Sequence, residues 1–134
     1  FKVCDKEFTG IFLTVGNPHT VIEIKDLSTC QVAKYGKIIE NYKYFPMKTN
    51  VEFVEIIDEK NIKVRVWERG VGETLACGTG AVASAFALYK EEKVENDVNV
   101  ELAGGKLNVR CDMESNEVWM TGNAVNVFDG EIDF

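Results

Sequence analysis

The sequence predicts an α+β fold in which a strongly curved, mostly antiparallel sheet wraps around a buried central helix. Strand-like segments rich in Val, Ile, Phe and Thr recur along the chain and are separated by short turn sequences. Only two segments have helical character, and the second is small or apolar almost all round, which is typical of a buried helix. With 134 residues, 46% of them hydrophobic, residues 1–134 are expected to form a single folded domain.

The first half of the chain is expected to supply two strands and a helix. Residues 8–15 and 20–24 have the composition of strands, and Gly16-Asn17-Pro18 marks the turn between them. Ser28 is the expected N-cap of a helix over residues 31–41, because a serine side chain accepts hydrogen bonds from a first helical turn. The apolar face of that helix consists of Val32, Tyr35, Ile38 and Ile39.

The second half is expected to contain a hairpin, the buried helix and a run of closing strands. Residues 51–57 and 61–67 have strand composition and are joined by a polar turn at residues 58–61. The buried helix covers residues 79–91, where alanine and larger apolar residues predominate. Turn sequences separate four further strands, which are residues 97–102, 106–111, 117–121 and 124–128.

Composition and charge argue against several classes of function. The formal net charge of −7 disfavours nonspecific binding to nucleic acid or to an anionic membrane, which requires clustered Lys and Arg. The apolar stretch at residues 81–89 is much shorter than the ~18 residues of a membrane span, and no signal peptide is visible. The four cysteines lack the spacing of a zinc site, so we expect a reduced, cytoplasmic protein without a metal.

The most informative segment places a cysteine, Cys77, between small residues at the start of the buried helix. Backbone N–H groups in a first helical turn have no intrahelical partner, and the helix dipole is positive at that end. Both effects favour an anion, whether the thiolate of Cys77 or the carboxylate of a bound acid. Gly78, Thr79 and Gly80 leave room for a small ligand to contact the backbone. The segment therefore predicts a reactive thiol beside an anion-binding site.

Five polar residues are candidates for completing a pocket around the thiol. Arg69 suits bidentate binding of a carboxylate, and Glu68 before it can hold an ammonium group. His19, the single histidine, can act as acid or base, and Asn17 and Asn50 can form hydrogen bonds. Each also has an ordinary interpretation, as an exposed ion pair, a packed histidine or a turn residue. The remaining cysteines are expected to be inert, namely Cys4, Cys30 and Cys111.

Two kinds of chemistry are open to such a thiol. As a nucleophile it would form an acyl intermediate and need a base such as His19. As a general base it would remove the α-proton of an amino acid, and inversion would then require a second group on the opposite face of the carbanion. The chain supplies one well-placed cysteine and begins at Phe1 without an initiator Met. Both features are expected of half of a larger molecule.

Five short motifs occur in a fixed order over nearly the whole chain. They are Gly16-Asn17-Pro18-His19, Phe45-Pro46 with Thr49-Asn50-Val51-Glu52-Phe53, Trp67-Glu68-Arg69-Gly70, Ala76-Cys77-Gly78-Thr79-Gly80-Ala81, and Thr121-Gly122 with Ala124. Together they resemble the C-terminal half of the diaminopimelate epimerase family, whose members work without pyridoxal phosphate. The Cys-Gly-Thr-Gly element is shared with proline racemases, whereas Gly-Asn-Pro-His and Glu-Arg-Gly are more specific for the epimerases.

The resemblance implies catalytic roles at the reacting end of the substrate. Cys77 would be one of two thiols that exchange the α-proton and so interconvert LL- and meso-diaminopimelate, a step in lysine and cell-wall precursor biosynthesis. Gly78 and Thr79 would offer backbone N–H groups to the reacting carboxylate. Glu68 would contact the α-amino group, and His19 would help to set the protonation of the thiols.

The resemblance also implies which residues select the substrate and which partner is missing. Asn17, Asn50 and Arg69 would hold the distal amino-acid end. The family fold is a pair of similar domains, each a curved sheet around a central helix, with the substrate between the helix mouths. The first half, with its Asn-Gly-x-Arg-Cys motif and second thiol, is absent, so the chain alone should be inactive.

Several alternatives stay open. The expected partners are the amino-acid substrate diaminopimelate and an N-terminal half of the same enzyme, with a homodimer as a further candidate assembly. One alternative is a cofactor-independent racemase of another amino acid. Another is a non-catalytic ligand-binding domain, and a thiol hydrolase is a more distant third.

Overall fold

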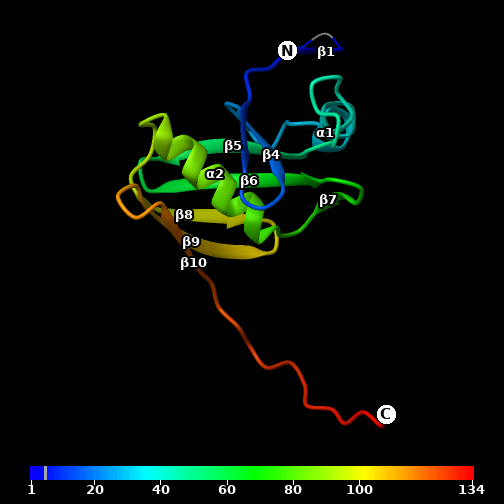
Figure 1. Cartoon of the computed structure of the whole chain (residues 1–134), viewed down its shortest axis with the longest axis vertical. Helices are drawn as coiled ribbons and strands as arrows, with labels where there is room; N and C mark the ends of the chain where they lie inside the picture. Colours follow the sequence, from blue (N-terminus) through cyan, green and yellow to red (C-terminus); the bar gives the residue numbers. More distant parts are fainter. Residues whose placement is uncertain (5) are drawn as a thin grey trace.

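The computed structural model describes residues 1–4 and 6–134, which form an eight-stranded sheet, a two-stranded sheet and two helices. The large sheet has the order β10-β9-β8-β6-β5-β4-β3, with β7 paired to β6 beside this path (Figure 1). Its strands are β3 (Ile11–Thr14), β4 (Pro18–Glu23), β5 (Asn50–Asp58), β6 (Asn61–Glu68), β7 (Gly72–Thr74), β8 (Asp97–Leu102), β9 (Gly105–Asp112) and β10 (Glu117–Thr121). The other elements are β1 (Lys2–Val3), β2 (Lys6–Glu7), α1 (Val32–Glu40) and α2 (Gly78–Lys90).

Most neighbouring strands of the large sheet are antiparallel, and the two helices account for the exceptions. Strand β4 lies parallel to β5, and β6 lies parallel to β8. A tight turn cannot join parallel strands, so the chain crosses over through α1 between β4 and β5 and through α2 between β6 and β8. The predicted mostly antiparallel sheet is confirmed, with two parallel crossovers that the strand pattern alone did not indicate.

The large sheet has two apolar faces, and each is covered by one helix. Successive side chains of a strand point to opposite faces, so adjacent residues belong to different clusters. On β4, Ile22 packs with Tyr35 and Ile39 of α1. Its neighbour Val21 packs instead in the cluster that contains Ala81 and the other alanines of α2. Inward-facing polar residues on the α2 side of β4, β5 and β6 are therefore directed toward that helix.

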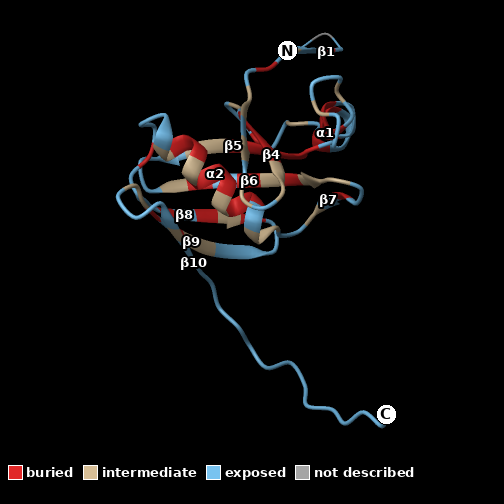
Figure 2. Cartoon of the chain, in the orientation of Figure 1, coloured by how far each residue is buried: buried red, intermediate tan, exposed pale blue. Residues whose placement is uncertain are grey.

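Most of the buried side chains of α2 are small, and this lets the sheet curve closely around the helix. Ala81, Ala83 and Ala85 have exposed fractions of 0%. Figure 2 shows α2 as a largely buried helix in front of the strands. The prediction of a buried central helix is confirmed, with a start at Gly78 rather than Thr79. Among the described residues no helix has the length and apolar character needed to cross a membrane.

Two predictions in the first half of the chain are wrong in detail. The N-cap of α1 is Gln31, which makes no side-chain capping bond. Ser28 instead donates its backbone N–H and its hydroxyl to Oδ1 of Asp26, a local arrangement that competes with helix capping. Strand β3 begins at Ile11 rather than at residue 8, because the backbone of Phe8 is hydrogen-bonded to Phe1.

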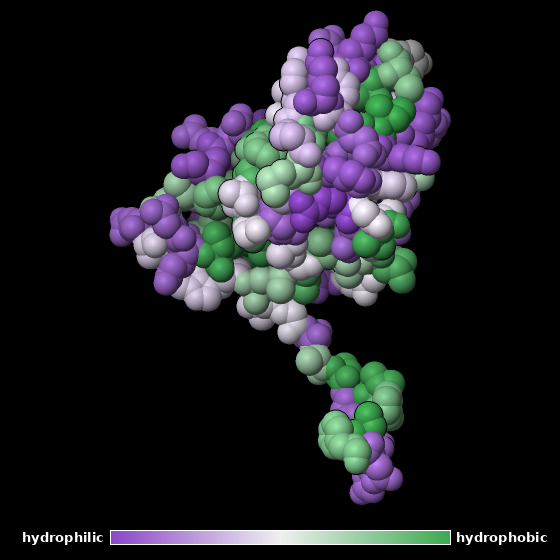
Figure 3. Space-filling view, turned by 45° about the vertical axis from the view of Figure 1, so that its right-hand side comes forward, coloured by the Kyte–Doolittle hydropathy of each residue, from purple (hydrophilic) through white to green (hydrophobic). Residues whose placement is uncertain are grey.

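The segment after β10 also differs from the prediction of a strand over residues 124–128. Residues 122–134 are exposed and extend away from the domain without pairing to any described strand (Figure 1). Figure 3 shows that this segment is rich in apolar surface. Its large apolar side chains are at least 75% exposed and are Val125, Val127, Phe128, Ile132 and Phe134. The sequence has the composition of a strand, but in this structure it has no partner strand.

Packing of α1 on the sheet depends on a glycine in the middle of the helix. A Cβ at Gly36 would lie 2.5 Å from both Cβ and Cγ of Trp67 on β6. We expect Gly36→Ala to lower the free energy of unfolding by about 1–3 kcal/mol through overpacking, despite the better helix propensity of alanine. Urea unfolding measures the change, and the exposed Lys37→Ala on the same helix is the control. Equal stability of the two variants would contradict this packing.

Candidate active site

A cavity of about 560 Å³ opens at the N-terminal end of α2. Its lining residues come from the turn between β3 and β4, the end of β6, the start of α2 with the residues just before it, and β10. They are Val15, Glu68, Ala76, Cys77, Gly78, Thr79, Val82 and Met120. Four of the residues singled out from the sequence, Cys77, Glu68, Gly78 and Thr79, therefore lie together at one opening.

Cys77 is the N-cap of α2, in an extended conformation with φ −144° and ψ 109°. Its Sγ accepts a hydrogen bond from the N–H of Gly80 at 3.3 Å and lies 3.5 Å from Oγ1 of Thr79. The sulfur thus takes the position that a Ser or Asp side chain takes in many helix caps. The helix dipole and the first-turn N–H groups make this end of α2 suited to a negatively charged ligand group.

Glu68 enters the cavity from the end of β6. It follows Val64 and Val66 at a spacing of two, so it shares with them the sheet face that packs against α2. Its Oε1 accepts a hydrogen bond from Oγ1 of Thr74 at 2.7 Å, which fixes one side of the carboxylate. Its place in the cavity lining leaves it available to a positively charged ligand group.

His19 lies behind the cavity and is fully buried. Its Nε2 is 3.0 Å from Oδ1 of Asn17, and its Nδ1 is 2.6 Å from Oε1 of Glu52. The imidazole of His19 therefore contacts both Asn17 and Glu52. The sequence motif contained Glu52, but no role was predicted for it. The signal that could have found it is a carboxylate at an inward position between apolar residues of a strand.

Glu52 is itself fully buried, and its second oxygen, Oε2, has no hydrogen-bond partner in the structure. Burial raises the pKa of Glu52 to about 6, although the hydrogen bond and charge of His19 act in the opposite direction. The charge of Glu68 contributes a further, smaller increase in the pKa. Raised carboxyl pKa values of this kind occur at functional sites and also in buried structural ion pairs.

Asn50 and Arg69 lie together beside the cavity rather than in its lining. The Asn50 side chain accepts from the backbone N–H of Arg69 at 2.8 Å and donates to the carbonyl of Pro18 at 2.9 Å. It therefore ties the starts of β4 and β5 to the end of β6. The guanidinium of Arg69 donates to the carbonyl of Met47 at 3.0 Å, and its other N–H groups have no partner among the described residues.

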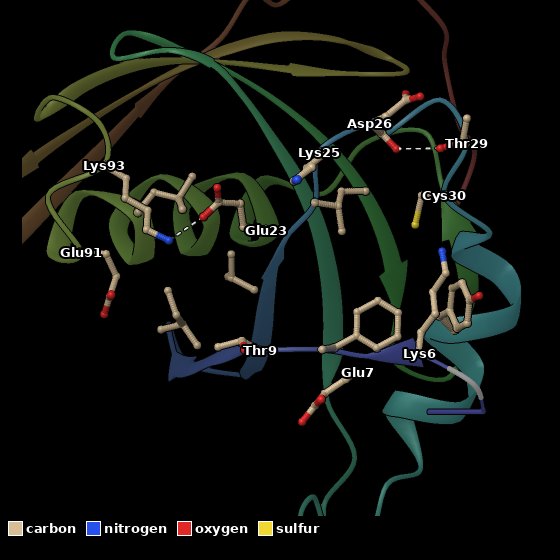
Figure 4. A pocket seen from close by; sticks show the side chains of 16 residues that line it. Lys6, Glu7, Thr9, Glu23, Lys25, Asp26, Thr29, Cys30, Glu91 and Lys93 are labelled. Atoms are coloured by element: carbon tan, nitrogen blue, oxygen red, sulfur yellow. Dashed lines mark hydrogen bonds and ion pairs between the residues drawn. The ribbon is translucent and has the colours of Figure 1, made fainter. Parts of the chain in front are cut away.

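A second cavity, of about 640 Å³, lies at the opposite end of α2 (Figure 4). Its rim carries Lys93 paired with Glu23, and Cys30 lies in its wall. Burial raises the pKa of Cys30, so its thiolate is disfavoured. The C-terminal end of a helix is also the negative end of its dipole, which is unfavourable for a bound carboxylate. We therefore place the candidate site at Cys77, in the smaller cavity.

A metal site is not indicated by the side chains that the structure places. Within residues 1–4 and 6–134, no group of three or more His, Cys, Asp or Glu side chains is arranged to hold a metal ion.

The fold is shared with solved proteins of distant sequence. A crystal structure of a Bacillus anthracis phenazine biosynthesis protein of the PhzF family matches 84% of this chain and 38% of that chain, with a TM-score of 0.57 and 22% identity. An Enterococcus faecalis protein of the PhzF family matches 74% and 35%, with a TM-score of 0.53 and 20% identity. The chain thus has the curved-sheet domain, closed around a central helix, of this fold class.

The sequence identifies the family within that class. The family model described as diaminopimelate epimerase matches residues 11–127, and the chain belongs to this family. It is 46% identical over 129 residues to diaminopimelate epimerase of Agathobacter rectalis, covering 96% of this chain and 45% of the relative. It is 48% identical to that of Acinetobacter baylyi over 121 residues, which are 90% of this chain and 43% of the relative. The chain therefore spans less than half the length of these relatives.

Proposed function

We propose that the chain is the C-terminal catalytic domain of an epimerase that interconverts LL- and meso-diaminopimelate. The observation that carries the proposal is the position of Cys77, whose thiol caps α2 at the opening of a cavity. A carboxylate, Glu68, lines the same cavity. Membership of the diaminopimelate epimerase family supports the choice of substrate.

The proposed chemistry is proton transfer at the α-carbon, without pyridoxal phosphate. The Cys77 thiolate removes the α-proton, or its thiol returns one, depending on the isomer bound. The N–H groups of Gly78 and Thr79 bind the substrate carboxylate and stabilise the negative charge that develops on it. Glu68 binds the α-ammonium group. His19 influences the thiol without contacting the substrate, since it is buried and does not line the cavity.

The distal end of the substrate is assigned to Arg69, with Asn17 and Asn50 supporting it. Among the described residues, the guanidinium of Arg69 is bonded only to the carbonyl of Met47, so its other N–H groups suit a carboxylate, and Asn50 fixes its backbone. Asn17 is held at the adjoining turn by its contact with His19. A substrate with a second amino-acid end would satisfy these groups, whereas a simple amino acid would not.

A second polypeptide region must supply the opposing acid–base group. Inversion requires proton transfer on both faces of the planar carbanion, and one thiol reaches only one of them. The chain spans less than half of its relatives, and its exposed apolar segment at residues 122–134 is suited to packing against another domain. We propose an N-terminal half of the same enzyme as this partner.

The test is exchange of the α-proton of diaminopimelate in heavy water, followed by NMR. We expect no exchange with this chain alone and exchange when it is assembled with an N-terminal half that carries the second thiol. Assembly is checked separately by size-exclusion chromatography. Assembly without exchange would overturn the proposed function and favour a racemase of another amino acid or a binding domain.

A further inference from the structure

The buried pair of His19 and Glu52 is the feature that the proposed chemistry does not yet use. Both side chains have exposed fractions of 0%, and Nδ1 and Oε1 are 2.6 Å apart. Burying a charged pair is costly unless its geometry and hydrogen bonds are good, and here Oε2 of Glu52 is left without a partner. Such a pair is poorly explained by stability alone.

Glu52 lies close to the Cys77 thiol, so the His19–Glu52 pair borders the candidate site. Residues Glu52 and Val66 are directly paired on β5 and β6, and both face the first turn of α2. A Cβ on Gly80 would lie 3.0 Å from Oε1 of Glu52 and 3.3 Å from Sγ of Cys77. The carboxylate and the thiol therefore border the same small space, which a glycine keeps open.

The hydrogen bonds of His19 define the charge of the pair. Asn17 Oδ1 is an acceptor, so it requires a hydrogen on Nε2. One further hydrogen lies between Nδ1 and Oε1 of Glu52, whichever of the two atoms carries it. With both hydrogens the pair has no net charge. This matters for the proposed function, in which Cys77 acts as a thiolate, because an uncompensated carboxylate beside the sulfur would oppose a negative charge there.

We propose that Glu52 is a positioning residue of the site, which orients the imidazole of His19 and keeps the hydrogen between Nδ1 and Oε1 in place behind the Cys77 thiol. The role rests on the proposed function, in which Cys77 exchanges a proton. The ionisable groups around Glu52 are His19 on β4, Glu68 on β6 and Cys77 at the start of α2. Glu52 does not contact the substrate, because it does not line the cavity.

The first test uses the fact that His19 is the only histidine of the chain. Labelling with ¹⁵N-histidine gives one pair of ring nitrogens, so NMR needs no assignment between histidines. We expect a far-downfield, slowly exchanging proton between Nδ1 and Oε1 in the unsubstituted chain, and its loss in Glu52→Gln. The matched control is Glu55→Gln on the same strand. Its carboxylate accepts from the backbone N–H of Leu27, away from His19, so this variant should leave the signal unchanged. Absence of the signal in the unsubstituted chain would overturn the proposal, even where Glu52→Gln fails to fold.

The second test separates positioning from a purely structural role. In the assembled enzyme, Glu52→Gln is expected to lower kcat at least about tenfold, since a positioned acid–base group contributes about 10²–10⁴-fold to the rate. KM should stay within about twofold, because the substrate contacts are unchanged. Glu55→Gln should alter neither constant. If the unsubstituted enzyme exchanges the α-proton and Glu52→Gln retains its kcat, the role of Glu52 is wrong, whereas absence of exchange in both would count against the proposed function itself.

Discussion

Replacing Cys77 with serine is expected to abolish α-proton exchange by the assembled enzyme while the fold of this chain is retained. Serine is among the preferred N-cap residues, so its hydroxyl can accept the N–H of Gly80 that Sγ accepts now. A serine hydroxyl is far less acidic than a thiol and is a poor proton acceptor in its neutral form. We expect the exchange rate to fall by at least about 10²–10⁴-fold, the usual contribution of a general acid or base.

A second variant, Cys77→Ala, separates the capping role of Cys77 from its chemistry, and Cys4→Ser is the control. Cys77→Ala removes both, so it should be equally inactive and also less stable by about 1 kcal/mol, the usual cost of losing a cap. Cys4→Ser, at an exposed cysteine, should change neither activity nor stability. Exchange is followed by NMR in heavy water, and unfolding is followed in urea. Substantial exchange by Cys77→Ser would remove Cys77 from the mechanism.

Much of the fold could be predicted because it depends on local periodicity. Strands β8 and β10 have the predicted bounds, and the hairpin of β5 and β6 has its turn where predicted. The composition of α2 was sufficient to predict a largely buried helix. Burial on every side was too strong a prediction, because Val82, Phe86 and Tyr89 form a partly exposed stripe along one face. The position of Cys77 at the N-terminal end of α2 could be predicted from the same segment, because an N-cap depends only on neighbouring residues.

The features that the sequence did not reveal depend on distant parts of the chain. The pairing of His19 with Glu52 joins residues 33 positions apart and exists only because β4 and β5 are parallel neighbours. Asn50 is a residue type common in turns, yet its side-chain amide joins β5 to Pro18 and Arg69 by hydrogen bonds. A strand prediction for residues 124–128 failed for a related reason, because strand composition specifies a structure only where a partner edge is present.

The second large effect is expected for His19→Leu, which should lower the free energy of unfolding because the buried Glu52 carboxylate loses its partner. Without the imidazole, Glu52 keeps its burial and loses its hydrogen bond to Nδ1, and Oε2 already has no partner. Removing one member of a buried charged pair typically costs about 3–5 kcal/mol. We expect a loss of this size in the free energy of unfolding at neutral pH, measured by urea denaturation. The double variant His19→Leu/Glu52→Leu should recover most of it, because no buried carboxylate remains.

The loss in His19→Leu should depend on pH in a defined direction. The pKa of Glu52 in the folded protein is already raised to about 6, and the imidazole is one of the groups that lower it. Removing the imidazole therefore raises this pKa further. A carboxyl group whose folded-state pKa exceeds its unfolded value favours folding below the unfolded value, and this contribution is lost as the pH rises through the folded pKa. The destabilisation by His19→Leu should thus be smaller at pH 5 than at pH 8, and the double variant should lack this difference. An equal loss at both pH values would mean that the Glu52 carboxylate gains solvent or another partner when His19 is removed.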